Sequence, residues 1–133
     1  LKTLAEKLRI GGRVKWMGWA DKDEKYRALS GADLFVLTSY NENFANVVLE
    51  SLAVGTPVLV SDKVGLYEYV ARSGAGKVTT LSVADICQTL NSFYKDHQRF
   101  SGEELALKVT RDYNGEALAG QYIAHYQKLK LTS

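Results

Sequence analysis

The chain has 133 residues, 46% of them hydrophobic, and its 17 Lys and Arg stand against 15 Asp and Glu, a formal net charge of +2. This length supports one modest hydrophobic core, which excludes a two-domain enzyme, and the balanced charge argues against nucleic acid as a partner. A single cysteine excludes an intramolecular disulfide and, with two histidines, leaves no recognisable Cys/His metal pattern. A reducing, cytoplasmic setting and a metal-free chain are expected.

The first ten residues have apolar side chains at helical spacing and begin with Leu1 rather than Met. No apolar run in the chain approaches the roughly 20 residues that a membrane-spanning helix requires, and the N-terminus lacks the order of a signal peptide. We therefore expect a chain without a membrane span that is a fragment of something longer.

Strand and helix patterns alternate along the chain. A glycine pair precedes the strand pattern of residues 13–19, and residues 33–39 form a nearly continuous apolar run, typical of a strand buried on both faces of a parallel sheet. Helices are expected where apolar residues recur at three- and four-residue steps. The predicted strands are 13–19, 33–39, 57–62 and 76–80, and the predicted helices are 1–10, 21–32, 43–54, 65–74, 82–96, 101–112 and 114–131.

Strands separated by helices indicate a Rossmann-like α/β fold, with a parallel sheet and flanking helices. In such folds ligands bind beyond the carboxyl ends of the strands, where strand order reverses. The turn "SYNEN" directly follows the strand pattern of residues 33–39. Topology alone therefore makes this turn a candidate ligand loop.

The residues of this turn and of the helix after it suit a ligand with two sugar rings. Backbone N–H groups of a helix that begins near Asn43 favour a phosphate, which Glu42 would repel, so Glu42 is expected to reach past it to neutral hydroxyls. Glu50 lies about 12 Å further along the helix. A nucleoside diphosphate sugar would meet one carboxylate at each sugar ring. Alternatively, Glu42 is a solvated loop residue and Glu50 an ordinary surface residue of the helix.

The stretch "GADLFVLTSYNENFANVVLESLAVGTPVLVSDKVGLYEYV" resembles the signature region of the family 4 (group 1) retaining glycosyltransferases. That signature combines A-D-hydrophobic-hydrophobic-hydrophobic-x-P-S, E-G-F-G, a second Glu with seven residues between, A-x-G-x-P-V and G-G-x-x-E. The stretches "RVKWMGWADKDEKYRALSGAD" and "GEALAGQYIAHYQKL" resemble the segments that flank the signature in the family. The resemblance covers nearly the whole chain.

The resemblance implies half of a GT-B architecture, a two-domain enzyme with facing Rossmann-like halves, in which residues 1–133 form part of the C-terminal nucleotide-sugar-binding domain. Glu42 is similar to the catalytic-site glutamate that contacts donor-sugar hydroxyls near the reacting carbon, and Glu50 to the glutamate that binds ribose. Trp19 and Ala20 match the turn that lies against the nucleobase. The segment that contacts the donor sugar and diphosphate corresponds to Asn43, Phe44, Ala45, Asn46 and Val47. The family's reaction generally needs no metal.

The sequence departs from the family pattern at three glycines. Asn43 and Ala45 replace the two glycines of E-G-F-G, where glycine permits left-handed dihedral angles and close backbone approach. Val64 replaces the first glycine of G-G-x-x-E. The departures in E-G-F-G bear on the shape of the sugar pocket, and hence on the donor, more than on phosphate binding.

Family members carry, upstream of the point where this chain begins, two strands, an Arg/Lys pair that neutralises the departing diphosphate, and an N-terminal acceptor-binding domain. Transfer needs that neutralisation, so the chain alone is expected to be inactive. With the family's strand order 3-2-1-4-5-6, the missing strands lie between residues 13–19 and 33–39. Unpaired edges would remain, which predicts a dimer, a domain exchange or a rearranged sheet.

Two classes of function follow from these residues. The first is the donor-binding part of a glycosyltransferase that transfers a hexose to a glycan or lipid-linked acceptor in polysaccharide biosynthesis. Lys128 and Lys130 would allow peripheral contact with the inner face of the membrane. The second is a noncatalytic nucleotide-sugar-binding or interaction module with the same fold. The absence of a G-x-G-x-x-G fingerprint argues against an unrelated Rossmann-like enzyme.

Overall fold

The protein is described by a computed structural model, which defines residues 1–96, 100–116, 118–120, 123 and 127. Three parallel strands form one sheet in the order β1–β2–β3, with β1 at Phe35–Leu37, β2 at Val58–Ser61 and β3 at Gly76–Thr79. The helices are α1 (Lys2–Lys7), the 3-10 helix η1 (Gly11–Arg13), α2 (Lys22–Ser30), α3 (Asn46–Ala53), α4 (Tyr67–Ser73), α5 (Val83–Asp96) and α6 (Gly102–Asp112). The predicted α/β class with a parallel sheet and flanking helices is confirmed.

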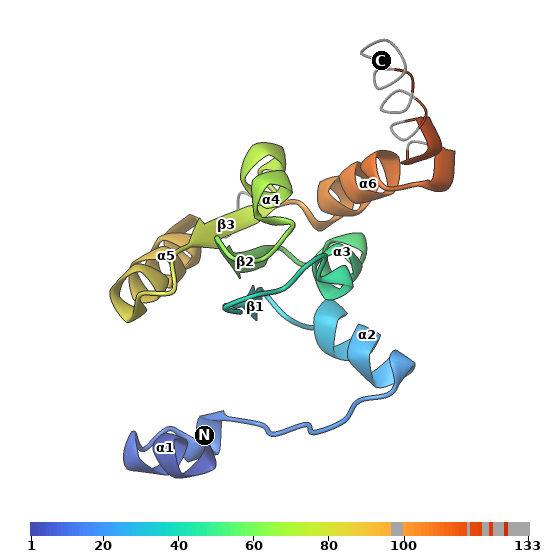
Figure 1. The fold of residues 1–133 in the computed structure, drawn as a ribbon. Helices are drawn as coiled ribbons and strands as arrows, with labels where there is room; N and C mark the ends of the chain where they lie inside the picture. The colour runs from blue at the N-terminus through green and yellow to red at the C-terminus, as the bar shows by residue number, and fades with distance from the viewer. Residues whose placement is uncertain (97–99, 117, 121–122, 124–126, 128–133) are drawn as a thin grey trace.

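The sheet carries helices on both faces (Figure 1). The helices α3, α4 and α6 pack on the face that bears Phe35, Val58 and Val60, whereas α5 contacts β3 from the opposite face. The central strand β2 is buried along its whole length: three apolar residues are followed by Ser61, whose hydroxyl donates to the carbonyl of Ser39 at 2.6 Å. The buried members of the core are Ala45, Val48, Leu52, Val58, Val60, Val64, Leu66, Tyr69, Val70, Ala75, Leu105 and Val109.

Two glycines allow α3 and α6 to pack closely. Gly55 ends the α3 segment at φ +84°, a left-handed conformation that glycine adopts readily. A Cβ atom added to Gly55 would lie 2.9 Å from both the Cα and the carbonyl oxygen of Gly102, at the start of α6. The two backbones therefore touch without intervening side chains.

Residues 1–20, here called the N-terminal arm, lie apart from the sheet and from the helices that flank it (Figure 1). The predicted strand 13–19 is wrong: η1 ends at Arg13, and the residues that follow pair with none of the described strands. Val14 has extended dihedral angles, but a strand needs a neighbour for its ladder of hydrogen bonds. Without one, Trp16 and Met17 expose 46% and 47% of their surface.

The edge strand β1 is less covered than its sequence predicts. Phe35 and Leu37 pack against the core, but Val36 faces the other side of the sheet and exposes 43% of its surface. The helix on that side, α5, contacts β3 at the far edge. The expectation that residues 33–39 are buried on both faces is therefore wrong for Val36.

Most of the predicted helix 114–131 lies outside the described residues, as do Lys128 and Lys130. Within the described part of the chain, no helix combines the length and apolar character needed to cross a bilayer. The expected dimer or domain exchange, and the expected membrane contact, stay predictions.

Candidate functional site

The loop between β1 and α3 is bound to the loop between β2 and α4 through its backbone. The N–H of Glu42 donates to the carbonyl of Lys63 at 3.4 Å, and the N–H of Gly65 donates to the carbonyl of Glu42 at 2.7 Å. Glu42 and Val64 form a parallel β-bridge. The backbone of Glu42 is therefore fixed by an isolated bridge outside the three strands, while its side chain stays exposed.

Gly65 explains why one glycine of the G-G-x-x-E segment is retained. A Cβ atom on Gly65 would lie 1.6 Å from the carbonyl oxygen of Asn43, so no other residue fits without moving the backbone. Val64, which replaces the other glycine, is fully buried in the core. The loss of that glycine is therefore compatible with tight packing of the two loops.

Ala45 begins α3 in the left-handed conformation, at φ 52° and ψ 60°. This conformation costs a non-glycine residue roughly 1–2 kcal/mol, which gives a physical reason for the glycine that the family pattern has there. Asn43 does not share the strain, because among the described non-glycine residues only Arg9 and Ala45 have positive φ. No side chain caps the N-terminus of α3, and the Val48 N–H already donates to the carbonyl of Ala45 at 2.8 Å, which leaves the N–H groups before Val48 for an anion.

Phe44 is held by aromatic contacts with residues distant in sequence. Its ring meets the ring of Tyr113 edge to face, with centroids 6.2 Å apart, and Tyr113 meets Tyr69 in the same way at 4.9 Å. The Tyr69 hydroxyl donates to Oδ2 of Asp112 at 3.2 Å, and burial, followed by the Asp112 charge, raises the pKa of Tyr69. Although Phe44 exposes 48% of its surface, Tyr113 orients it.

A hollow of about 200 Å³ lies beside Glu42, lined by Asn41, Glu42, Asn43, Asp62, Lys63, Val64, Gly65 and Tyr67. Asp62 places its Oδ1 atom in a buried position where no described donor reaches it, and its Oδ2 atom is 3.4 Å from Nζ of Lys63. The hollow thus offers several hydrogen-bond acceptors and one exposed cation.

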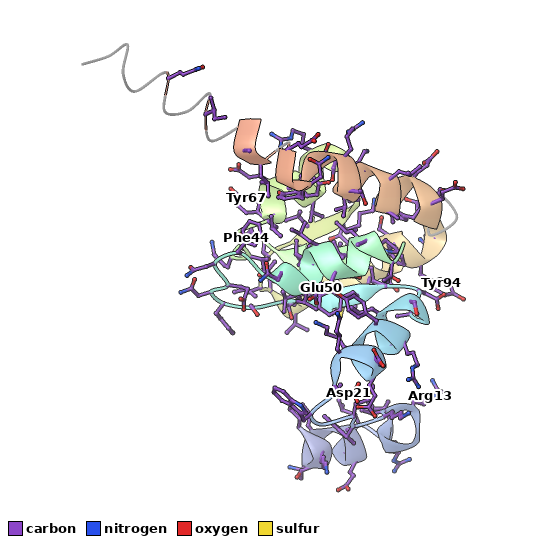
Figure 2. The ribbon with its side chains drawn as sticks, turned by 90° about the vertical axis from the view of Figure 1, so that its right-hand side faces the viewer. Arg13, Asp21, Phe44, Glu50, Tyr67 and Tyr94 are labelled. Atoms are coloured by element: carbon purple, nitrogen blue, oxygen red, sulfur yellow. The ribbon has the colours of Figure 1, made fainter. Side chains whose placement is uncertain are left out.

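Glu50 lines a second hollow, of about 620 Å³, which lies between the N-terminal arm, α2 and α3. Figure 2 shows Glu50 on the side of α3 that faces α2, above Asp21. Trp19, at the end of the arm, exposes 95% of its surface, so one wall of this hollow is an uncovered indole. The residues around the hollow are Trp19, Ala20, Asp21, Lys22, Lys25, Tyr26 and Glu50.

Glu50 forms an ion pair with Lys25 of α2. The Nζ atom of Lys25 is 2.8 Å from Oε1 of Glu50, and the two side chains expose 37% and 26% of their surface. The hydrogen bond to Glu50 raises the pKa of Lys25, while desolvation opposes the shift. Nζ of Lys25 also lies 5.2 Å from the ring centroid of Tyr26, within cation–π range.

The structure brings together Trp19, Ala20 and Glu50, which the sequence places far apart, around the larger hollow. Glu42 and Asn43 line the smaller hollow, so the two glutamates do not share one cavity. Phe44, Ala45, Asn46 and Val47 connect the two regions at the start of α3.

The sequence analysis missed Lys25 and Tyr26. Lys22, Lys25 and Tyr26 follow one another at steps of three and one along α2, and residues spaced by three or four lie on the same helix face. That spacing, counted from the turn at Trp19 and Ala20, could have placed Lys25 near the candidate ligand site. It could not have shown that Glu50 is the partner, because 25 positions separate the two residues.

The described residues contain no group of three or more His, Cys, Asp or Glu side chains that could hold a metal ion. Expectations about metals and cofactors therefore stay predictions. The groups present at the site are carboxylates, helix N–H groups and an exposed aromatic ring.

A parallel sheet flanked by helices, with candidate binding residues beyond the carboxyl end of a strand, is typical of a Rossmann-like domain. The family described as "Glycosyl transferases group 1" matches residues 1–106. The chain therefore belongs to the group 1 glycosyltransferases.

Individual relatives agree with this family. A D-inositol 3-phosphate glycosyltransferase of Corynebacterium urealyticum is 32% identical over 97% of this chain and 31% of its own length. A lipopolysaccharide core biosynthesis glycosyltransferase of Rhizobium meliloti is 44% identical over 44% of this chain and 17% of its own length. The chain thus spans about a third or less of these relatives.

Among solved structures, the sucrose-phosphate synthase of Thermosynechococcus elongatus matches 99% of this chain with a TM-score of 0.78 and 27% sequence identity. The match covers 34% of that protein. It agrees with the Rossmann-like fold of a GT-B glycosyltransferase domain.

Proposed function

We propose that this chain is the donor-binding part of a retaining, family 4 glycosyltransferase and belongs to the C-terminal half of a two-domain enzyme. The observation that carries the proposal is the shared hollow of Trp19, Ala20 and Glu50, where Glu50 belongs to the same helix, α3, whose start no side chain caps. These are the groups that a nucleoside diphosphate sugar requires: an aromatic surface, a hydroxyl acceptor and free N–H donors.

In this proposal the donor lies along α3. The nucleobase packs against Trp19, the ribose hydroxyls donate to Glu50, and the diphosphate accepts from the N–H groups that follow Ala45. The transferred sugar reaches the smaller hollow, where the Glu42 carboxylate accepts hydrogen bonds from its hydroxyls. The left-handed Ala45 leaves a methyl group where the family has none, which restricts the sugars that fit.

In the proposed reaction, the bond between the anomeric carbon and the diphosphate oxygen breaks, and its electron pair leaves with the nucleoside diphosphate. The acceptor hydroxyl forms the new bond from the same face, and its proton passes to the departing diphosphate. Neutralising the developing charge and binding the acceptor need groups that we assign to polypeptide outside residues 1–133. This chain alone is therefore expected to bind the donor without transferring it.

The transferred group is proposed to be a hexose and the acceptor a glycan or a lipid-linked sugar. One relative of 27% identity is an N,N'-diacetylbacillosaminyl-diphospho-undecaprenol alpha-1,3-N-acetylgalactosaminyltransferase of Campylobacter jejuni, whose name states a lipid-linked acceptor. We place the reaction in the cytoplasm, at the inner face of the membrane when the acceptor is lipid-linked.

Calorimetric titration of the chain with UDP, GDP, UDP-glucose and GDP-mannose tests the proposal, after circular dichroism has shown that the chain is folded. We expect heat with the nucleotides of one base, and its loss in Glu50→Ala. Glu42→Gln should weaken binding of the nucleotide sugar but not binding of the free nucleotide, because Glu42 is assigned to the transferred sugar alone.

If the folded chain gives no binding heat with any of the four ligands, the proposal is contradicted. Binding that is equal in the unaltered chain and in Glu50→Ala would contradict the assignment of Glu50 to ribose. Nucleotide binding here, combined with no transfer by the longer protein, would favour the noncatalytic module instead.

A further inference from the structure

Lys25 and Glu50 connect two elements that form opposite sides of the larger hollow. The pair joins α2 to α3 at 2.8 Å, with both side chains partly withdrawn from solvent. Glu50 thus has a partner within the protein itself, which a simple ribose-binding carboxylate would not need. The pairing either competes with a ligand or prepares the carboxylate for one.

The position of Lys25 is fixed by contacts at both ends of α2. At the start, Asp21 and Glu24 form a capping box, in which the Glu24 N–H donates to Asp21 at 2.8 Å. At the end, the hydroxyl of Thr56 donates to the carbonyl of Leu29 at 2.7 Å. Because α2 is held at both ends, its position and its rotation about its own axis are set, and with them the place of Lys25 opposite α3.

The geometry indicates that Lys25 orients Glu50 for a ligand and does not compete with the ligand for it. Lys25 donates to Oε1 of Glu50, and Oε2 accepts no hydrogen bond from any described residue. A carboxylate offers about four lone-pair positions, so it accepts from one ammonium and from two hydroxyls together. The ring of Tyr26 also attracts the ammonium, with 5.2 Å between Nζ and the ring centroid.

We propose that Lys25 is a positioning residue for the ribose site, one that holds the Glu50 carboxylate in the hollow beside Trp19 so that its free oxygen accepts from a ribose hydroxyl. This role rests on the proposed function, since it requires a nucleotide in the hollow. It adds Lys25 of α2 to the predicted site residues Trp19, Ala20 and Glu50, which belong to the arm and to α3.

The test compares the affinities of Lys25→Met, Lys25→Arg and the unaltered chain for UDP or GDP, whichever binds. Met keeps most of the length of the side chain and removes its charge, and should weaken binding on the order of tenfold, the change expected for one charge-assisted hydrogen bond. Lys25→Arg should retain most of the affinity. The control Arg27→Met removes a charge from an exposed position of α2 outside the hollow and should leave affinity unchanged.

Two further ligands separate positioning from direct contact with phosphate. A positioning role predicts that Lys25→Met weakens binding of the nucleoside as much as binding of the nucleoside diphosphate. The loss of affinity should be smaller for the 2'-deoxynucleoside diphosphate. Loss confined to the diphosphate, and reduced by salt, would show that Lys25 contacts phosphate and would overturn the proposal.

A ligand-free measurement tests the contact itself. The pKa of Lys25, followed by NMR of its side chain, should fall in Glu50→Gln, because the hydrogen bond that Lys25 donates to Glu50 is the main cause of its rise. An unchanged pKa would overturn the proposal. If the unaltered chain binds no nucleotide, both proposals fail; if it binds and Lys25→Met changes nothing, only the role of Lys25 fails.

Discussion

Leu4 and Leu8 in and beside α1 have the same four-residue spacing as Val48 and Leu52 in α3, yet they expose 53% and 59% of their surface while the α3 pair exposes none. The difference lies in the neighbours. The helix α3 packs against the sheet on one side and α6 on the other, whereas α1 packs chiefly on η1. Spacing predicts a helix and its apolar side, and a partner surface decides whether that side is buried.

The largest contrast is expected from adding one methyl group to a glycine in each region. Gly65→Ala should lower the free energy of unfolding by about 3 kcal/mol or more, because its Cβ would lie 1.6 Å from the carbonyl oxygen of Asn43. In the arm, Gly12→Ala meets nothing within 4 Å and should change stability little. Urea unfolding followed by circular dichroism measures both. Equal effects would mean that the loop of Gly65 does not touch the loop of Asn43.

Truncating a leucine in each region should give a somewhat smaller contrast. Leu52→Ala leaves a cavity under α3 and should cost about 2–5 kcal/mol. Leu8→Ala removes a side chain that is 59% exposed and should change the free energy of unfolding by about 0.5 kcal/mol or less. Thermal or urea unfolding separates the two, and a large loss in Leu8→Ala would show that the arm is covered in solution.

The pair Ala45→Gly and Ala28→Gly tests the strain at the start of α3. At Ala45, relief of the left-handed conformation, roughly 1–2 kcal/mol, outweighs the lost burial of one methyl group, about 0.8 kcal/mol. Ala28 is exposed in α2, where glycine should cost about 1 kcal/mol. In urea unfolding, Ala45→Gly should be at least as stable as the unaltered chain, and Ala28→Gly should be less stable. The reverse order would show that Ala45 is not strained.

The smallest expected effect concerns acid stability at Asp112. Its hydrogen bond from Arg111 is the main cause of a lowered pKa, assisted by the Tyr69 hydroxyl and opposed by desolvation. A carboxyl group with a lower pKa in the folded state stabilises it above the unfolded pKa and loses that contribution as pH falls through the folded one. Below about pH 4, Asp112→Asn should therefore lose less stability than the unaltered chain. Parallel acid titrations would contradict this.

The sheet and its helices were predictable because their partners lie within the chain. The strand expected from Pro57 is observed as Val58–Ser61, and the helix expected over residues 82–96 as Val83–Asp96. Residues 13–19 failed because a strand pattern records a preference for extended backbone, and strand formation also requires a neighbour with which to pair. Local pattern cannot supply that neighbour.

The candidate site divides in the same way. Glu42 and Glu50 were predictable from their place after a strand and on a helix, and the structure sets Glu50 in one hollow with Trp19 and Ala20. The partner Lys25 and the support of Phe44 by Tyr113 depend on contacts between residues distant in sequence. Such contacts follow from how helices cross, which residue spacing does not encode.

The direct contact between Gly55 and Gly102 has a mechanical consequence. Helices separated by side chains shift against each other by exchanging rotamers, but two touching backbones have no rotamers to exchange. A rotation of α3 on ligand binding must therefore carry the start of α6 with it. Amide hydrogen exchange near Gly102 would then report on a ligand bound at the other end of α3.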